Sequence, residues 1–223
     1  MYVHPKFAIS ADEALAFARK RGFGVAVACN RGKPIAVHVP FVIRSDEQRR
    51  VAVEFHVSKA NPIAACADAC MDWLIVVQGP DAYVSADWYV SQDQVPTWLY
   101  EAVHLTGPVR AMPVGQTHRH SDELSAEFER RLLPKPPWTS EKMSEARREG
   151  LRSGIVGLTM QVLTIEGQRK LNQHKADPDF IAVADHLLEV GEHSSGLIGA
   201  EMQKERPHLP YKTARTPQTE PAE

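Results

Sequence analysis

The chain has 223 residues, a formal net charge of −2 at neutral pH and 43% hydrophobic residues. The length suits one well-packed domain with an extra subdomain, or two small domains. The small charge argues against a general attraction to nucleic acid or anionic lipid. The N-terminus has no apolar signal segment, no stretch is long enough to cross a membrane, and the three cysteines lack the spacing of a disulfide framework. We therefore expect a cytoplasmic protein with no membrane association.

In the first half of the chain, strand signals dominate after one N-terminal helix. Ser10 is a candidate N-cap for a helix over 11–21, and Gly22 is a candidate stop signal. Gly79-Pro80 has the character of a turn, and Gly107-Pro108 indicates a bend in the strand that contains it. A short helix is expected over 63–70. The expected strands are 23–29, 35–43, 51–57, 73–77 and 98–112.

The second half is richer in charged residues. Amphipathic patterns predict helices over 121–133 and 139–152, joined by a proline-rich connector. A β-branched run predicts a strand over 155–165, and a further helix is expected over 177–190. The end of the chain, 204–223, is rich in Pro, Thr and Glu, which predicts a flexible tail.

Many early strands, later helices and the absence of β-α-β alternation predict a mainly β fold with added helices. We expect an antiparallel barrel that forms one domain overall. Its expected parts are barrel strands with an N-terminal helix in 1–115, a helical insert in 116–153, the last barrel strand with a C-terminal helix in 154–192, and the tail at 204–223.

The stretch 79–107 is the most aromatic part of the chain. It contains Trp88, Tyr89 and Trp98, together with Tyr83 and Tyr100. Indole and phenol rings give a large contact area and carry a polar group, so such a stretch can present a binding surface. The same rings could instead fill the barrel core, and spacing alone favours the core.

Polar clusters follow three of the strands, at 38–41, 56–62 and 170–175. The second cluster combines His56, Ser58, Lys59 and Asn61 just before a possible helix start at Pro62. A cation, neutral hydrogen-bond donors and helix N-terminal amides together suit a phosphate. A solvated strand end explains the same residues equally well.

Other chemistries have weaker support. The histidines could bind a metal or a haem iron, but their spacing matches no compact metal site, and Cys66 and Cys70 are better explained as small buried thiols. We therefore predict no metal. The sequence has no nucleotide-binding glycine loop, no Gly-x-Ser-x-Gly elbow and no evident helix–turn–helix pair. No catalytic residue can be assigned.

Eight short motifs follow one another along residues 1 to about 190. They are Met1-Tyr2-Val3-His4-Pro5-Lys6-Phe7, His38-Val39-Pro40-Phe41, 56–62, 79–85, Trp88-Tyr89, 95–100, Gly154-Ile155-Val156-Gly157 and 170–174. Each motif is short, but the ordered set is specific. The set resembles that of the PaiB family of FMN-binding negative transcriptional regulators.

The resemblance implies a split β-barrel of the FMN-binding type with peripheral helices, which is usually a homodimer with flavin at the subunit interface. It implies a phosphate site at His56, Ser58, Lys59 and Asn61 and a ring site at Trp88, Tyr89, Thr97 and Trp98. Lys170 and Gln173 would approach the polar edge of the ring or the ribityl chain. A nearby cation favours a reduced, anionic flavin, so Lys170 would tune the potential. His38 completes the predicted cofactor-binding set.

Four positions depart from the family pattern. The family usually has Asn at Leu99, Ser at Asn172 and Asn at His174, and Arg is common at Lys59. Leu99 removes an amide, and Asn172 and His174 enlarge side chains near the expected ligand. These changes predict either weaker flavin retention or a different contact at the ring edge. Lysine in place of arginine keeps the charge but loses the bidentate fork.

Three functions remain open from the sequence. The first is a dimeric FMN-binding regulator with a DNA or protein partner. The second is an FMN-dependent oxidoreductase related to pyridoxamine-phosphate oxidases, because a fold does not fix a function. The third, with less support, is a haem-binding split barrel suggested by the histidines. Flavin binding is the prediction that the first two share.

Overall fold

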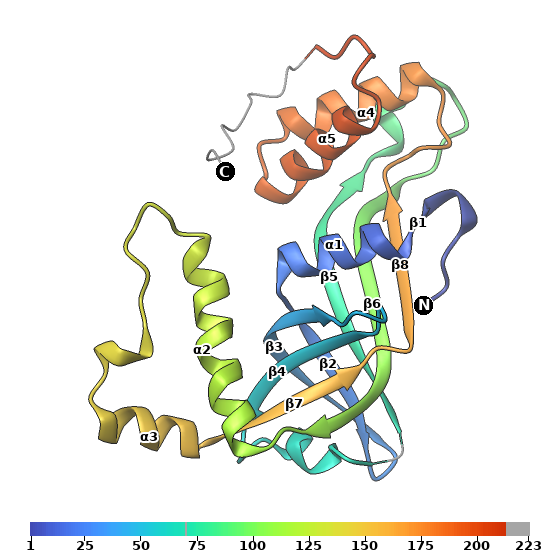
Figure 1. The fold of residues 1–223 in the computed structure, drawn as a ribbon. Coiled ribbons are helices and arrows are strands. Elements are labelled where there is room, and N and C mark those ends of the chain that lie inside the picture. Colours follow the sequence, from blue (N-terminus) through green and yellow to red (C-terminus); the bar gives the residue numbers. More distant parts are fainter. Residues whose placement is uncertain (70, 213–223) are drawn as a thin grey trace. The chain divides into compact units, whose positions relative to one another are not determined.

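The computed structural model in Figure 1 describes residues 1–69 and 71–212. By its internal contacts the chain divides into two compact units, and each is described by itself. Of the described residues, unit 1 contains Met1, 10–77 and 103–166, and unit 2 contains 2–9, 78–102 and 167–212.

The helix α1 (Ala11–Arg21) begins and ends where local signals predict. The Ser10 hydroxyl accepts a hydrogen bond from the Glu13 backbone N–H at 3.2 Å, and the Glu13 carboxylate accepts one from the Ser10 N–H at 2.9 Å. This reciprocal capping box satisfies two amides that a helix start leaves unpaired. Gly22, with a φ of 59°, ends the helix in the left-handed conformation that glycine adopts without strain. The predicted cap and stop are confirmed.

The strands form one antiparallel network whose pairings close into a cycle. Hydrogen-bonded neighbours follow the order β1-β8-β6-β5-β2-β3-β4-β7, and β7 also pairs with β6. The cycle therefore runs through β6, β5, β2, β3, β4 and β7, as expected for a split barrel. The strands are β1 (Ala8–Ile9), β2 (Phe23–Asn30), β3 (Lys33–Ser45), β4 (Val51–Ser58), β5 (Asp72–Val84), β6 (Thr97–Ala111), β7 (Ile155–Gln161) and β8 (Thr164–Lys170).

The core of unit 1 lies inside this cycle. Alternate residues of β4, such as Val53 and Phe55, have none of their surface exposed, as the two-residue period of a strand requires. Phe55 pairs with Phe41 of β3 on one side and with Leu158 of β7 on the other. Burial of these apolar side chains is the main favourable contribution to the stability of the unit.

The helix α2 (Val114–Arg130) packs on β7, β3 and β4. Figure 1 shows it beside these strands, with the short helix α3 (Glu145–Ser153) beyond it. The Thr117 hydroxyl of α2 accepts a hydrogen bond from the backbone N–H of Gly157 at 3.2 Å, which ties the helix to β7. Two short 3-10 helices, η2 (Pro62–Cys66) and η4 (Ser140–Lys142), complete unit 1.

Several predicted boundaries in unit 1 are wrong. The helix expected over 121–133 begins at Val114, because its polar first turns pack on the barrel although they lack an apolar stripe. The helix expected over 139–152 is replaced by η4 and α3, and Ser144 caps α3 through the Arg147 N–H. The last strand, expected over 155–165, is split between β7 and β8.

Unit 2 is built around two helices. The helices α4 (Asp177–Glu189) and α5 (His193–Glu205) pack against each other, and apolar side chains from the ends of β5, β6 and β8 join them. Phe180, Leu187 and Met202 are fully buried in this core. The 3-10 helices η1 (Pro5–Phe7) and η3 (Ala86–Trp88) also belong to the unit.

The C-terminal part of unit 2 differs from its expectation. Sequence analysis gave no helix after 177–190, whereas α5 extends to Glu205 and so includes the first residues of the expected tail. Leu209 and Tyr211 pack against the core, and the Lys212 N–H donates to the Asp185 carboxylate at 3.1 Å. The rest of the expected tail, 213–223, lies outside the described residues.

One expected interruption in the strands is absent. Gly79-Pro80 lies within β5, which continues to Val84, so the turn predicted there is wrong. Gly107 lies within β6, which runs from Thr97 to Ala111 as one strand, and the bend expected at this position stays a prediction.

No α-helix among the described residues combines the length and the apolar character that a membrane span requires.

Candidate functional site

The residues predicted to bind the cofactor divide between the two units. Unit 1 contains His38, His56, Ser58, Lys59 and Asn61. Unit 2 contains Trp88, Tyr89, Thr97, Trp98, Lys170 and Gln173.

Unit 2 has a pocket of about 310 Å³, which we call the cationic pocket. It brings together three of the six predicted residues of this unit: Tyr89, Thr97 and Lys170. The seven other residues that line it are His4, Lys6, Phe7, Val95, Asn172, His174 and Lys175.

The lining of the cationic pocket carries positive charge. Lys6, Lys170 and Lys175 contribute ammonium groups, and none of the described residues that line the pocket is acidic. Burial lowers the pKa of Lys170. Burial, and then the charges of Lys175, Lys6 and Lys170, lower the pKa of His174. Each shift reflects the cost of positive charge at a site that burial and neighbouring cations already disfavour. An anion or a carbonyl oxygen would relieve that cost.

Lys170 lies at the end of β8 and reaches across to β6. Its Nζ donates a hydrogen bond to the Thr97 hydroxyl at 2.6 Å and lies 6.0 Å from the centre of the Phe7 ring. Lys175 bonds to the Gln94 side chain, and its Nζ lies 4.7 Å from the centre of the Tyr89 ring. Thr97 and Gln94, the hydrogen-bond partners of these two ammonium groups, are neutral, so both cations can still attract a negatively charged group.

Asn172 forms the buried end of the pocket and has none of its surface exposed. Its Nδ2 donates to the Tyr89 hydroxyl at 3.1 Å, whereas its Oδ1 has no hydrogen-bond partner among the described residues. If the amide were turned over, Tyr89 would still engage one end and leave the other unpaired. A buried polar atom without a partner is costly, and a ligand that hydrogen-bonds to it removes that cost.

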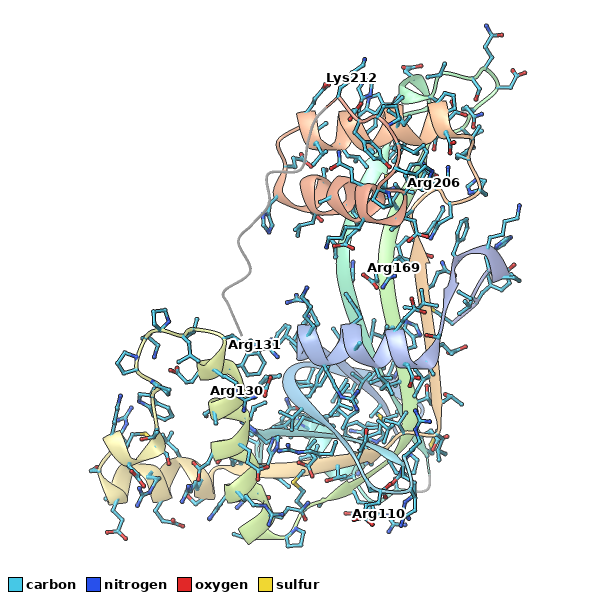
Figure 2. The ribbon with its side chains drawn as sticks, turned by 45° about the horizontal axis from the view of Figure 1, so that its top comes forward. Arg110, Arg130, Arg131, Arg169, Arg206 and Lys212 are labelled. Carbon is cyan, nitrogen blue, oxygen red and sulfur yellow. The ribbon has the colours of Figure 1, made fainter. Side chains whose placement is uncertain are left out.

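Arg206, which caps the end of α5 and is labelled in Figure 2, binds the loop that carries Asn172. Its guanidinium donates to the backbone oxygens of Gln173 and Lys175 at 2.8 and 3.2 Å, and to the Asp177 carboxylate at 2.7 Å. Gln173 also serves this loop. Its amide donates to the Arg169 carbonyl at 2.7 Å and accepts from the Leu171 N–H at 2.8 Å. Gln173 therefore shapes the loop and is not part of the pocket lining.

Neither predicted tryptophan of unit 2 lines the cationic pocket. Trp88 stacks on the His186 ring, with centroids 5.5 Å apart and planes at 10°, and packs against the core of α4 and α5. Trp98 is 54% exposed and meets Tyr83 edge to face at 5.9 Å. Tyr89 is buried, so the aromatic stretch supplies both core and surface residues.

Sequence reasoning missed the contribution of the N-terminal segment to the pocket. The strand β1 pairs with β8, with Ala8 opposite Gln168, and the His4 N–H donates to the Gln168 side chain at 3.1 Å. These contacts bring His4, Lys6 and Phe7 beside Lys170. The available signal was the match of residues 1–7 to a family motif, to which no role had been assigned.

The predicted phosphate segment of unit 1 is largely engaged in local turns. The Ser58 hydroxyl accepts from the Ala60 N–H at 3.2 Å, and Asn61 Oδ1 accepts from the Ile63 N–H at 3.1 Å. The Ser58 O–H, the Asn61 amide protons and the exposed Lys59 ammonium can still donate. An anion site here stays a prediction.

The two predicted histidines of unit 1 have structural contacts. His56 Nδ1 lies 3.4 Å from Nε2 of His120, which α2 contributes, and burial lowers the pKa of His56. His38 stacks on Phe23 with ring centroids 6.2 Å apart.

Among residues 1–69 and 71–212, no group of three His, Cys, Asp or Glu side chains is arranged to hold a metal ion. Of the predicted thiol pair, Cys66 is buried and not in a disulfide, and Cys70 lies outside the described residues.

Comparison with known sequences identifies the family. Residues 1–164 match the family model described as "Putative FMN-binding domain". The protease synthase and sporulation protein PAI 2 of Bacillus subtilis is 31% identical over 188 residues, which cover 84% of this chain and 89% of that protein. An uncharacterised protein of Saccharomyces cerevisiae is 28% identical over 100 residues, 41% of this chain and 59% of its own length. The chain belongs to the family of FMN-binding, PaiB-like proteins, and its cofactor is a flavin.

Comparison with solved structures confirms the predicted fold of the split-barrel flavin-binding type. An FAD and heme binding protein of Mycobacterium smegmatis superimposes with a TM-score of 0.55 at 15% identity, over 79% of this chain and 80% of that one. The flavocytochrome Anf3 of Azotobacter vinelandii gives 0.52 at 12% identity, over 74% and 69%. At these identities the likeness concerns the fold alone.

Proposed function

We propose that the cationic pocket of unit 2 receives the flavin ring at its polar edge. That edge presents carbonyl oxygens and an N–H group. The Lys170 ammonium suits a carbonyl oxygen, and the unpaired end of the buried Asn172 amide suits either a donor or an acceptor. Phe7 and Tyr89 add aromatic surface for a flat ligand. One observation carries the proposal: the buried Asn172 amide has a hydrogen-bond partner at only one end. It lies in a pocket whose described lining contains lysines and no acidic residue.

The departures from the family pattern support a changed contact at the ring edge. Asn172 and His174, where the family usually has Ser and Asn, both line the cationic pocket. Leu99 has none of its surface exposed and packs in the core of unit 2. Its substitution for Asn therefore adds a core contact and takes no donor from the pocket lining. We infer that flavin is retained with Asn172 in the place of a smaller hydroxyl.

When bound, a flavin supplies reversible electron transfer. The residues of this chain would position the ring: Asn172 and Lys170 would fix its polar edge, and Tyr89 would hold Asn172 in place. Burial raises the pKa of the Tyr89 phenol, so the phenol keeps its proton and can donate or accept at neutral pH.

The role that the PaiB resemblance implies is regulation, and we propose that the chain acts as a cytoplasmic, FMN-binding regulator. Retention of promoter DNA with a steep salt dependence would support this role. Steady oxidation of NADH or NADPH by the FMN-loaded protein, without DNA retention, would support an oxidoreductase instead.

We further propose that the chain forms a homodimer through unit 2. Unit 2 exposes apolar side chains that a second copy could cover: Trp98, Val90 and Val95 are 54%, 68% and 71% exposed. Light scattering of the wild type should give twice the chain mass. Trp98→Asp should shift the population toward the monomer, and a monomeric wild type would contradict the proposal.

The flavin site itself is tested by an isosteric charge change. Asn172→Asp keeps the shape of the side chain, but it removes the amide N–H donors and puts a negative charge beside a ring edge that carries carbonyl oxygens. We expect FMN to bind about tenfold more weakly, a loss of the size expected for a charge-assisted contact. Asn30→Asp, on the hairpin between β2 and β3, is the matched control. Equal FMN affinity for wild type and Asn172→Asp would contradict the proposal that the ring lies in this pocket.

A further inference from the structure

Unit 1 has a second pocket that the flavin site does not use. It lies among α2, α3 and the segment between them, has a volume of about 290 Å³, and is called the insert pocket here. His56 of β4 and Ile155 of β7 contribute from the barrel. The insert supplies the rest of the lining, including Trp138, Met143, Arg148, Leu151 and Arg152.

One part of the insert pocket is apolar and incompletely covered. Trp138 is 36% exposed and Leu151 is 54% exposed, although both side chains line the pocket. The helix α3 has no buried residue, so little apolar burial holds this part of the insert. A flat apolar ligand in contact with Trp138, Met143 and Leu151 would bury this surface, at roughly 25 cal/mol per Å².

The other part of the insert pocket is positive. Arg148 and Arg152 are one helical turn apart on α3 and therefore lie on the same face. Arg152 donates to the Asp122 carboxylate of α2 at 2.5 Å, which neutralises that pair. The Arg148 guanidinium has no ion-pair or hydrogen-bond partner among residues 1–69 and 71–212. One positive charge at this pocket is therefore not neutralised.

The hydroxyl groups on α2 add acceptors and donors beside these charges. The Ser121 hydroxyl donates to the His118 carbonyl at 2.7 Å, and the Ser125 hydroxyl donates to the Ser121 carbonyl at 2.9 Å. Both oxygens keep lone pairs that can accept from a ligand. Small-molecule sites combine an apolar lining with a few such polar groups.

From these features we infer that the insert pocket binds a small planar aromatic acid. Its ring would pack on Trp138 and Leu151, and its carboxylate would pair with Arg148, whose fork of donors matches a carboxylate. A ligand in this place would contact both α2 and α3 and so fix the insert. The inference stands apart from the flavin site, because the cationic pocket is lined by residues of unit 2 alone.

The test is a calorimetric titration of the full-length protein with benzoate, salicylate and indole-3-acetate, each compared with its neutral amide. At least one acid should bind, and more tightly than its amide. Arg148→Gln should weaken that binding by about tenfold, which is the size of a charge-assisted hydrogen bond. Arg147→Gln is the matched control, since Arg147 is the exposed neighbour on α3 and does not line the pocket.

Four results would overturn the inference. Three of them are no binding of any acid, equal binding of an acid and its amide, and equal affinity in Arg148→Gln and Arg147→Gln. Competition between the acid and FMN would also overturn it, because the acid would then occupy the flavin pocket. FMN affinity should be the same in Arg148→Gln as in the wild type. If no acid binds the insert pocket, the flavin proposal is unaffected. If FMN does not bind, the acid titration still tests the insert pocket.

Discussion

At the scale of single residues, Gly107 shows how closely two strands of unit 1 approach. A Cβ added at this position would lie 1.9 Å from the backbone oxygen of Gln161 and 2.9 Å from its carbonyl carbon. A clash with backbone atoms cannot be relieved by a side-chain rotation. Glycine is therefore required by close approach, and the bend expected from Gly107-Pro108 is not needed to explain it.

We predict that Gly107→Ala lowers the free energy of unfolding by about 3 kcal/mol or more, because β6 or β7 must shift. Urea denaturation followed by circular dichroism measures this loss. Gly115→Ala is the control, since nothing lies within 4 Å of its added Cβ and alanine favours the helix α2. A loss below 1 kcal/mol for Gly107→Ala would mean that the two strands can separate at little cost.

His120 is the second residue whose environment gives a testable consequence. Its side chain is 1% exposed, and burial, followed by the charges of His56 and Arg44, lowers its pKa to about 4. The neighbouring acid is Glu54, whose Oε2 lies 3.9 Å from His120 Nδ1. A histidine with a lowered pKa stays neutral in the folded protein while the unfolded chain takes up a proton.

Stability should therefore fall as the pH decreases from about 6.5 toward 4, by up to about 3 kcal/mol from His120. Above that window the contribution is constant. His120→Leu removes the titrating group and should flatten the profile in this range, whereas His208→Leu, at an exposed site, should leave it as it is. Urea midpoints at a series of pH values provide the measurement, and identical slopes for wild type and His120→Leu would contradict the account.

At the scale of elements, the N-terminus of α1 depends on side-chain caps. Ser10→Ala removes the hydroxyl that accepts from Glu13 and should cost about 1 kcal/mol. Ser10→Thr keeps a hydroxyl that can both accept from the Glu13 N–H and donate to the Glu13 carboxylate, and it should cost less than half as much. Thermal unfolding of the two variants tests this, and equal melting temperatures would show that the cap contributes nothing.

The N-terminus of α4 is joined to the loop after η3 by Asp179. Its carboxylate accepts from the N–H groups of Val90 and Ser91, each at 2.9 Å, and from the Ser91 hydroxyl at 2.7 Å. Burial alone would raise the pKa of Asp179, but these hydrogen bonds outweigh it and lower the pKa. The stabilisation is therefore present at pH values above about 4 and is lost as the pH falls through the lowered pKa.

Asp179→Asn should destabilise the protein by about 1–3 kcal/mol at pH 7. The difference from the wild type should shrink below pH 4, where the wild-type carboxyl also takes up its proton. Denaturation at pH 7 and pH 3 measures both values. A difference that stays constant between the two pH values would exclude the carboxylate as the source of the effect.

Local sequence signals predicted the elements that local interactions determine. Ser10 and Gly22 delimit α1 through contacts within a few residues, and alternation over 51–57 gave β4 with its buried face. The helix α5 was missed because its apolar residues are separated by serine and glycine and become a pattern only against α4. The turn expected at Gly79-Pro80 was wrong because strand pairing there overrides the preference of the two residues.

The cationic pocket was only partly predictable for the same reason. Tyr89, Thr97 and Lys170 were proposed from the family motifs, and the structure brings them together. The contribution of the N-terminal segment depends on the pairing of β1 with β8, between residues about 160 positions apart in the chain. No local sequence pattern predicts a pairing between residues so far apart in the chain. Trp88 and Trp98 were expected at the ring because aromatic residues suit it. Neither lines the cationic pocket, and their place at the ring stays a prediction.

At the scale of the whole molecule, the central claim is that this PaiB-like chain binds FMN with Lys170 at the ring. The most direct measurement is a titration of FMN fluorescence with wild-type protein and with Lys170→Met, using Lys204→Met, on the exposed end of α5, as the control. We predict quenching at micromolar concentrations of wild type and Lys204→Met, and affinity about tenfold lower for Lys170→Met. No quenching by the wild type, or equal affinity for all three proteins, would contradict the account.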